Sequence, residues 1–270
     1  MMPPRKYPLT IIITLKLYHL TICLSIFINH FKSKSILFSD KILLSMHVSV
    51  IFKKGHMPPR GRIIRKYMKK EKIYSTFSHI PTLESENIIL RKLLVSDADD
   101  FFDYAHDRTL TEYLTWSPHP DKEYTVRYLQ YVTSRYRTGD FYDWAIVDKK
   151  SGKMIGTCGF TRFDFINNAA EIGYVVNPSF RGRGIASEAL GRVIKFGFEE
   201  LPLNRLECRY IDGNTASRRV MEKNHMTFEG IKREGILVKG LYRDVGTCSL
   251  LKSEYRKYCL ATDEGPVGEA

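Results

Sequence analysis

Apolar and polar residues repeat with two different periods between residues 85 and 255, and each change of period marks an expected element. Apolar side chains recur every three or four positions in "EYTVRYLQYVTSRY" (123–136), which predicts an amphipathic helix. Further helices are expected after Ser96, which would be the N-cap of an acidic first turn, after position 184, and over 214–224. Strands are expected at 86–93, in two pieces around the Lys-Lys-Ser-Gly turn of 141–163, and at 169–176, 204–211, 228–234 and 244–252.

The resulting order is strand, two helices, three strands, helix, strand, helix and two strands. This order is not a regular βαβ alternation, and it predicts a mixed α/β fold of one domain. A chain of 270 residues exceeds the typical domain of about 150 residues without requiring two. The expected organisation is an N-terminal extension (1–67), a lead-in segment (68–84), the folded domain (85–255) and a polar tail (256–270), whose end is expected to be disordered.

The positive charge of the chain is concentrated at its N-terminus. The formal net charge is +12, but residues 1–70 contain 14 Lys and Arg and one acidic residue. Residues 71–270 contain 28 Lys and Arg against 29 acidic residues, so the expected domain is close to neutral. This distribution argues against a basic nucleic-acid-binding domain, and no direct nucleic-acid binding is expected.

The N-terminal extension contains an apolar stretch, 9–31, that is long enough to span a bilayer. Lys16 and His19 interrupt it, and a central lysine costs about 3 kcal/mol on the insertion scale. Three interpretations stay open: a membrane anchor, an organelle-type presequence, or an upstream extension without function. We favour the last, with the working protein beginning near Met57 or Met68, so membrane contact is expected only if 9–31 acts as an anchor.

Cysteine spacing gives no sign of a metal site or a disulfide framework. The five cysteines lie far apart, without a CxxC pair or a nearby histidine cluster. They are typical of reduced thiols, so a cytoplasmic protein without a metal is expected.

The segment "VVNPSFRGRGIASEAL" (175–190) indicates a phosphate-binding device. A strand ends at Asn177-Pro178, an Arg-Gly-Arg-Gly turn follows, and an amphipathic helix begins at once. The N-terminus of a helix offers free N–H groups and partial positive charge, and glycines let successive N–H groups face one ligand. Arg181 and Arg183 add full charges, although a tight solvated turn would have the same composition.

The strand before this turn contains a glycine, Gly173, in its middle. Such a glycine usually marks a bulge or a close backbone approach. Pro178 cannot donate to a β-ladder, so strand pairing should stop there. A strand that splays from its neighbour leaves N–H groups that can hydrogen-bond an extended ligand.

These residues resemble the GCN5-related N-acetyltransferase (GNAT) family. "RGRGIA" (181–186) matches the family signature R/Q-x-x-G-x-G/A between a strand and a helix, and "NTASRRVMEKNHMTFEG" (214–230) is similar to its N-x-x-S…EK…EG segment. The resemblance covers roughly 85–255 and is nearest to the branch of ribosomal-protein N-terminal alanine/serine acetyltransferases. It implies a centrally splayed sheet flanked by helices and acetyl-CoA as the donor, with no metal.

The resemblance also implies where acetyl-CoA binds. Its pyrophosphate would lie on the turn, and its pantetheine arm along the end of the preceding strand, whose N–H groups would stabilise the oxyanion. The residues implied are Val175, Val176, Arg181, Gly182, Arg183, Gly184, Ile185 and Ala186. Asn214 would bond the pantetheine arm, or act only as the N-cap of its helix.

Two residues are candidates for catalysis. Ser217 would donate a proton to the departing sulfur, or is an ordinary first-turn serine. Glu171 would be the general base, or is a solvated strand glutamate; Glu234 is a weaker alternative. Because an α-amine has a pKa near 7.7–8.0, against about 10.4 for lysine, attack by a protein N-terminus needs little help from a base.

The acceptor amine is left open by the sequence. A protein N-terminal α-amine is the first expectation, and a small amine such as a polyamine, an amino acid or an antibiotic is the second. A non-catalytic acetyl-CoA-binding module is a third possibility. Trp144, Phe160 and Tyr174 are candidates for the acceptor pocket. His225, where the family usually has glycine in a left-handed C-cap, is expected to be structural.

Overall fold

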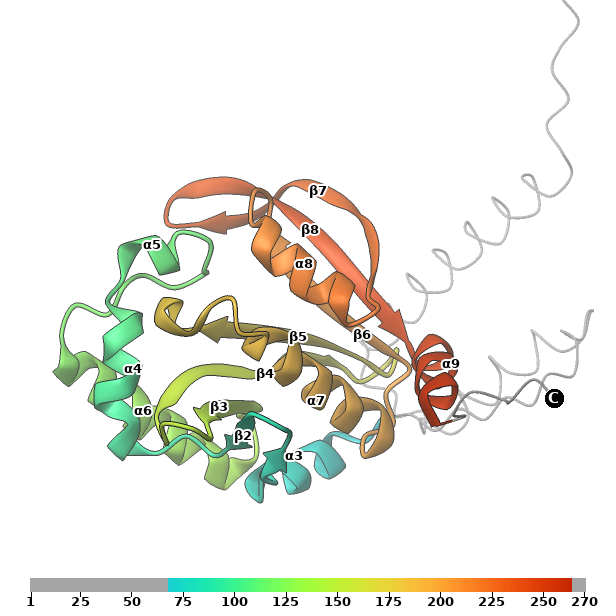
Figure 1. Ribbon diagram of the computed structural model, residues 1–270, viewed down its shortest axis with the longest axis horizontal. Helices are drawn as coiled ribbons and strands as arrows, with labels where there is room; N and C mark the ends of the chain where they lie inside the picture. The colour runs from blue at the N-terminus through green and yellow to red at the C-terminus, as the bar shows by residue number, and fades with distance from the viewer. Residues whose placement is uncertain (1–67, 264–270) are drawn as a thin grey trace, which may run out of the picture. The chain divides into compact units, whose positions relative to one another are not determined.

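One mixed eight-stranded sheet organises residues 68–263, which are the residues that the computed structural model describes (Figure 1). The strand order is β1-β2-β3-β4-β5-β6-β8-β7, and every neighbouring pair is antiparallel except β5 and β6. This arrangement confirms the expected mixed α/β fold. The strands are β1 Leu83–Glu84, β2 Ile88–Arg91, β3 Asp143–Asp148, β4 Met154–Asp164, β5 Ala169–Val176, β6 Arg205–Ile211, β7 Thr227–Val238 and β8 Leu241–Leu251.

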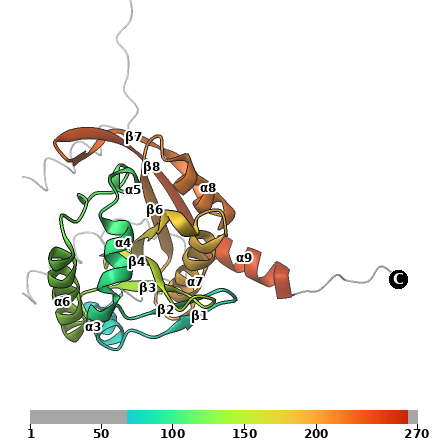
Figure 2. The ribbon, with the colours of Figure 1, turned by 60° about the vertical axis from the view of Figure 1, so that its left-hand side comes forward.

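Helices cover both faces of the sheet, with α4 and α6 on one face and α7 on the other (Figure 2). Successive strand residues point to opposite faces, so Trp144 packs in the cluster that contains α7, whereas Ala145 packs in the cluster that contains α4 and α6. The helices are α3 Lys70–Ser78, α4 Ala98–Ala105, α5 Arg108–Thr111, α6 Lys122–Thr138, α7 Ile185–Glu199, α8 Thr215–Lys223 and α9 Lys252–Asp263, with 3-10 turns η1 Val95–Asp97 and η2 Pro178–Phe180.

Strands β5 and β6 pair over only half of their length. Their pairing ends at Ile172 opposite Cys208, whereas β5 remains paired with β4 as far as Val176 and β6 with β8 as far as Ile211. Residues 173–176 of β5 therefore have a partner strand on one side only. The expected splay in the centre of the sheet is confirmed, and it opens immediately before the Arg-Gly-Arg-Gly turn.

The mid-strand glycine faces a bulge on the neighbouring strand. The register of β4 against β5 shifts between Phe160 and Arg162, so the irregularity lies in β4. A Cβ atom on Gly173 would lie 2.8 Å from Cγ2 of Thr161. The glycine therefore permits a close approach between the two strands.

Several expected boundaries need correction. Ser96 is not an N-cap, because it lies inside η1 and Asp97 directly precedes α4. The Asp97 carboxylate accepts a hydrogen bond from the Leu94 N–H (2.8 Å) and pairs with Arg91 (2.7 Å), which orders this turn. Helices α3 and α9 were not expected from the sequence, although α3 buries Ile73 and Phe77 in the core.

Other expectations fall outside the described residues. The extension 1–67, with the apolar stretch 9–31, and the last residues of the expected tail, 264–270, are among them. In the described part of the chain, no helix has both the length and the apolar character needed to cross a membrane.

Candidate active site

The Arg–Gly turn, residues 181–184, connects β5 to α7 as the sequence predicts. Gly182 and Gly184 have φ angles of +76° and +79°, and Gly184 is the N-cap of α7. An added Cβ would meet nothing within 4 Å at either position, so both glycines are required by backbone conformation rather than by space. The first intrahelical bond here runs from the Glu188 N–H to the Gly184 carbonyl oxygen, which leaves the preceding N–H groups of the first turn available.

The two arginines of the turn have different surroundings. Arg181 is exposed, whereas Arg183 pairs with Asp148 (2.9 Å) and lies over the ring of Phe180, 5.2 Å from its centroid. Arg181 is therefore the cation that is free to meet an anion at this helix N-terminus, and Arg183 would have to leave Asp148 to do so.

A cavity of about 760 Å³ lies where β5 and β6 diverge; we call it the central cavity. Its lining includes Tyr174, which packs with the α7 cluster, and Val175, which packs with the α4 and α6 cluster. The cavity therefore extends to both faces of the sheet through the splay. Of the residues expected at the site, Glu171, Tyr174, Val175, Asn214 and Ser217 line it.

On the α8 side of the central cavity, Asn214 and Ser217 begin a helix. The Asn214 side-chain oxygen accepts a hydrogen bond from the Ser217 N–H (3.1 Å), so Asn214 is the N-cap of α8. The Ser217 hydroxyl lies 2.9 Å from the Tyr174 hydroxyl. Burial raises the pKa of Tyr174 well above its usual range, so this phenol remains protonated at neutral pH. The hydroxyl groups of Ser217 and Tyr174 therefore lie next to each other beside the splay.

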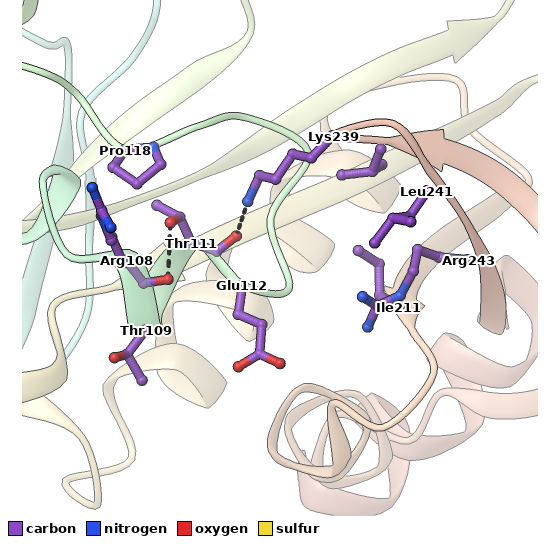
Figure 3. A pocket seen from close by; sticks show the side chains of 10 residues that line it. Arg108, Thr109, Thr111, Glu112, Pro118, Ile211, Lys239, Leu241 and Arg243 are labelled. Carbon is purple, nitrogen blue, oxygen red and sulfur yellow. Dashed lines mark hydrogen bonds between the residues drawn. The ribbon is translucent and has the colours of Figure 1, made fainter.

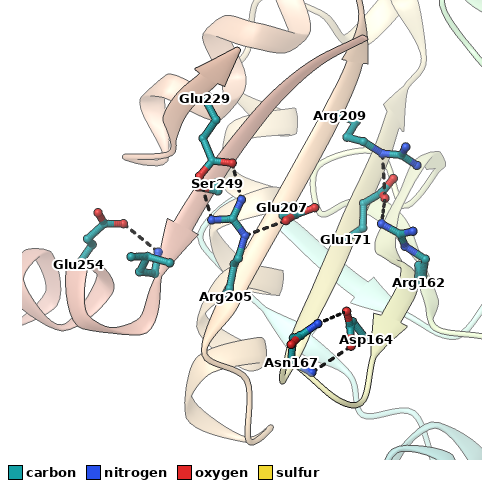
Figure 4. A network of polar contacts seen from close by, with 11 residues as sticks. Arg162, Asp164, Asn167, Glu171, Arg205, Glu207, Arg209, Glu229, Ser249 and Glu254 are labelled. Atoms are coloured by element: carbon teal, nitrogen blue, oxygen red, sulfur yellow. Dashed lines mark hydrogen bonds and ion pairs between the residues drawn. The ribbon is translucent and has the colours of Figure 1, made fainter. Parts of the chain in front are cut away.

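Glu171 is held by two guanidinium groups (Figure 4). Its Oε2 atom lies 2.9 Å from Nε of Arg209 and 3.4 Å from Arg162, but neither contact has hydrogen-bond geometry. Only 8% of the residue is exposed. The carboxylate is thus neutralised by cations from β4 and β6, in a position that lines the cavity.

Asp143 is a second carboxylate of the central cavity, and the sequence did not single it out. It is the first residue of β3. Burial raises its pKa to about 7, partly offset by hydrogen bonds from the Thr157 hydroxyl and the Trp144 N–H. Periodicity could not single it out, because only the fold brings it to the lining of the central cavity.

Five rings form the wall of the cavity on the α4 and α6 side. His119 is at their centre: its ring stacks on Phe101 at 14°, with 5.5 Å between centroids, and it contacts the others. Burial lowers the pKa of His119, so its ring is neutral at neutral pH. The rings are Phe101, Trp116, His119, Tyr124 and Tyr128.

Some expected site residues lie elsewhere. Trp144 and Phe160 belong to the core, at 0% and 3% exposure, and do not line the cavity, because their side chains point to the α7 face. Glu234 lies on β7 and is absent from the lining. His225 has a φ of +59°, which confirms the left-handed conformation, and its ring stacks on Tyr258.

A second cavity of about 530 Å³ lies between α5 and the β7–β8 hairpin (Figure 3). The Lys239 ammonium at the hairpin tip donates a hydrogen bond to the Thr111 carbonyl oxygen, which ties the hairpin to α5. Pro118 lines both cavities, so the second lies next to the aromatic wall of the first. In residues 68–263 no group of three or more His, Cys, Asp or Glu could hold a metal ion.

The family model for the acetyltransferase (GNAT) domain matches residues 87–227. The chain belongs to this family. It is 36% identical over 174 residues to the N-acetyltransferase p20 of Bacillus licheniformis, a match that covers 64% of this chain and 98% of that relative. The chain is therefore an N-acetyltransferase, and the family uses acetyl-CoA as its acetyl donor.

Two further similarities concern enzymes that act on ribosomal proteins. The chain is 31% identical over 96 residues to the ribosomal-protein-serine acetyltransferase of Escherichia coli, which covers 36% of this chain and 54% of that relative. It also resembles the solved structure of a ribosomal L7/L12 α-N-protein acetyltransferase in complex with coenzyme A. That match has a TM-score of 0.56 and 25% identity, and it covers 63% of this chain and 98% of the other.

Proposed function

We propose that this GNAT enzyme transfers the acetyl group of acetyl-CoA to a primary amine, first of all the α-amine of a protein N-terminus. The observation that carries the proposal is the splay of β5 from β6, which is followed at once by the Arg–Gly turn. In these two features, residues 173–176 of β5 have no partner strand on the β6 side, and the N–H groups in the first turn of α7 have no partner within the helix.

The residues of this run fit acetyl-CoA. Backbone N–H groups of 182–186 would hold the pyrophosphate, with the Arg181 side chain as the added cation, because the Arg181 N–H already donates to the Pro178 carbonyl oxygen. The pantetheine arm would lie along Val175 and Val176, and backbone N–H groups at the end of β5 would bond the thioester oxygen. Asn214 would contact the pantetheine arm through its side-chain NH2 group, since its side-chain oxygen already caps α8.

The hydroxyl pair is suited to the departing sulfur. Ser217 and Tyr174 line the splay, and their hydroxyl groups are within hydrogen-bond distance of each other. Ser217 would pass its hydroxyl proton to sulfur and regain a proton from solvent, while Tyr174, which donates to the Ser217 carbonyl oxygen (2.9 Å), would hold the serine hydroxyl in place. Glu171 is one candidate for the base on the acceptor side.

The volume of the central cavity accommodates a small amine or the first residues of a peptide. A protein N-terminus is favoured by the similarity to the two ribosomal-protein acetyltransferases. An α-amine is also the acceptor that needs least deprotonation at neutral pH.

The proposal is tested with the full-length chain, acetyl-CoA and peptides that begin with alanine or serine. Release of the thiol is measured together with the mass of the peptide product. We expect an added acetyl group on the free peptides and none on the same peptides with a blocked N-terminus and an internal lysine. Turnover of polyamines or amino acids without turnover of any peptide would move the acceptor to the small-amine class, and binding of acetyl-CoA without turnover of any amine would indicate a binding module.

A further inference from the structure

The central cavity contains two carboxylates, one with cationic surroundings and one with neutral surroundings. Glu171 is paired with Arg162 and Arg209, whereas Asp143 takes part in none of the ion pairs formed within residues 68–263. Enzymes that transfer protons often contain two acidic side chains whose different environments give them different pKa values. The two carboxylates of this cavity are therefore candidates for different tasks.

The groups that face Asp143 are polar but carry no positive charge. Its carboxyl group accepts a hydrogen bond from the Trp144 N–H (3.1 Å) and interacts with the Thr157 hydroxyl. The titratable groups near it come from α4, α6 and β4, and they are Tyr104, Tyr128, Tyr136 and Cys158. All are neutral at physiological pH, so an ammonium group entering the cavity would meet an uncompensated carboxylate.

The strand register points this carboxylate towards the splay. Asp143 on β3 lies opposite Gly159 on β4, and Gly159 lies opposite Gly173 on β5. A Cβ on Gly159 would lie 2.4 Å from the Asp143 Cα and from the Tyr142 carbonyl oxygen, and 2.7 Å from Oδ1 of Asp143, so the glycine lets the start of β3 lie close against β4. Two strand spacings, about 10 Å, separate the backbones of Asp143 and Gly173, and no side chain stands at the intervening position.

The aromatic wall faces the same region. Tyr128 and Phe101, with ring centroids 5.4 Å apart, line the cavity with His119, which is neutral and therefore does not repel a cation. Ring faces attract an ammonium group and exclude water around it. A cationic amine is thus drawn towards the carboxylate from the α4 and α6 side.

We propose that Asp143 is the proton acceptor for the substrate amine, and that the acceptor enters the central cavity as a primary ammonium ion held between Asp143 and the aromatic wall. This assignment rests on the proposed function. An amine nitrogen in the central cavity, which Asp143 lines together with Gly173 and Val175, would be within reach of the Asp143 carboxylate, directly or through one water.

The proton and electron balance of the step is simple. The ammonium nitrogen gives one proton to Asp143, and its freed lone pair forms the C–N bond with the thioester carbonyl carbon. The C–S bond breaks and its electron pair leaves on sulfur. Sulfur gains one proton, the nitrogen loses a second, and Asp143 later returns its own proton to solvent.

The test compares Asp143→Asn and Glu171→Gln in the full-length chain, with Asp99→Asn as a control for loss of an exposed carboxylate, 78% of whose side chain is accessible. The kcat and the kcat/KM for an alanine-initiated peptide are measured from pH 5.5 to 9 at saturating acetyl-CoA. In the wild type kcat/KM should rise with pH through a midpoint near 7, because Asp143 must be ionised to accept a proton. Asp143→Asn should lose this dependence and about 10²-fold in kcat, at unchanged affinity for acetyl-CoA. Asp99→Asn should match the wild type.

The fold of each variant is checked by circular dichroism and by its thermal midpoint at pH 8. Asparagine removes a charge that burial disfavours, so Asp143→Asn should be at least as stable as the wild type above pH 7. Asp143→Glu, which keeps the carboxylate, should retain more activity than Asp143→Asn. If Asp143→Asn turns over like the wild type, or if Glu171→Gln alone abolishes the pH dependence, the assignment is wrong while the acetyltransferase function stands. A wild-type chain that binds acetyl-CoA and acetylates no amine overturns both.

Discussion

The two sides of the splay are built from different parts of the chain. The proposed donor side, where acetyl-CoA would bind, consists of backbone groups in one continuous stretch, from Gly173 through the Arg–Gly turn to the start of α7. The proposed acceptor side consists of side chains from separate elements, with Asp143 on β3 and rings from α4, α6 and the segment between them. Backbone groups can bind a ligand without depending on particular side chains, whereas the proposed acceptor contacts depend on the side chains themselves.

Removing a hydroxyl at the boundary between the two sides should affect chemistry and leave binding intact. Ser217→Ala should lower kcat by about 10²-fold, the lower end for general acids, because a thiolate is a good leaving group. Affinity for acetyl-CoA should not change. Steady-state kinetics with a calorimetric Kd measure both quantities.

Tyr174→Phe is the matched variant for this prediction, because it removes the hydroxyl 2.9 Å from that of Ser217. A smaller loss than in Ser217→Ala would mean that Ser217 is the direct donor and Tyr174 its partner. Wild-type kcat in both variants would remove the hydroxyl pair from the mechanism.

Truncating a side chain of the aromatic wall should weaken binding of the acceptor and leave binding of acetyl-CoA unchanged. Trp116 lines the central cavity, and its ring lies 5.6 Å from that of His119. Loss of a ring face that attracts an ammonium group costs about 1 kcal/mol, so Trp116→Ala should raise KM for the peptide several-fold. The Kd for acetyl-CoA serves as the internal control. A change in that Kd without a change in KM would show that the wall belongs to the donor side.

The donor side could be predicted from the sequence because its geometry restricts residue type. Gly182 and Gly184 are in left-handed backbone conformations, which favour glycine, and Pro178 stops the pairing of β5. These residue types can therefore be recognised in the local sequence. The bounds of β5 agree with the expected strand for the same reason. The acetyl-CoA contacts of these residues remain predictions.

The acceptor side could not be predicted in the same way. Asp143 is an ordinary residue at the start of a strand, and only the register with Gly159 and Gly173 places it near the splay. Trp144 and Phe160 were expected at the acceptor pocket, but alternation along the strand turns them into the core. Which face of a central strand lines a cavity depends on the helices that pack against that face. This packing is a tertiary feature, so no local pattern in the sequence reveals it.

The most direct test of this account is a calorimetric titration of acetyl-CoA into the full-length chain and into an Arg181→Glu/Gly184→Asp variant. Lys195→Glu, on the exposed part of α7, controls for reversal of a charge. We predict micromolar binding to the wild type and to Lys195→Glu, with a loss of at least about tenfold, or 1.4 kcal/mol, in the double variant. Equal affinity in the folded double variant, or no binding by the folded wild type, would contradict the assignment of the Arg–Gly turn as the pyrophosphate site.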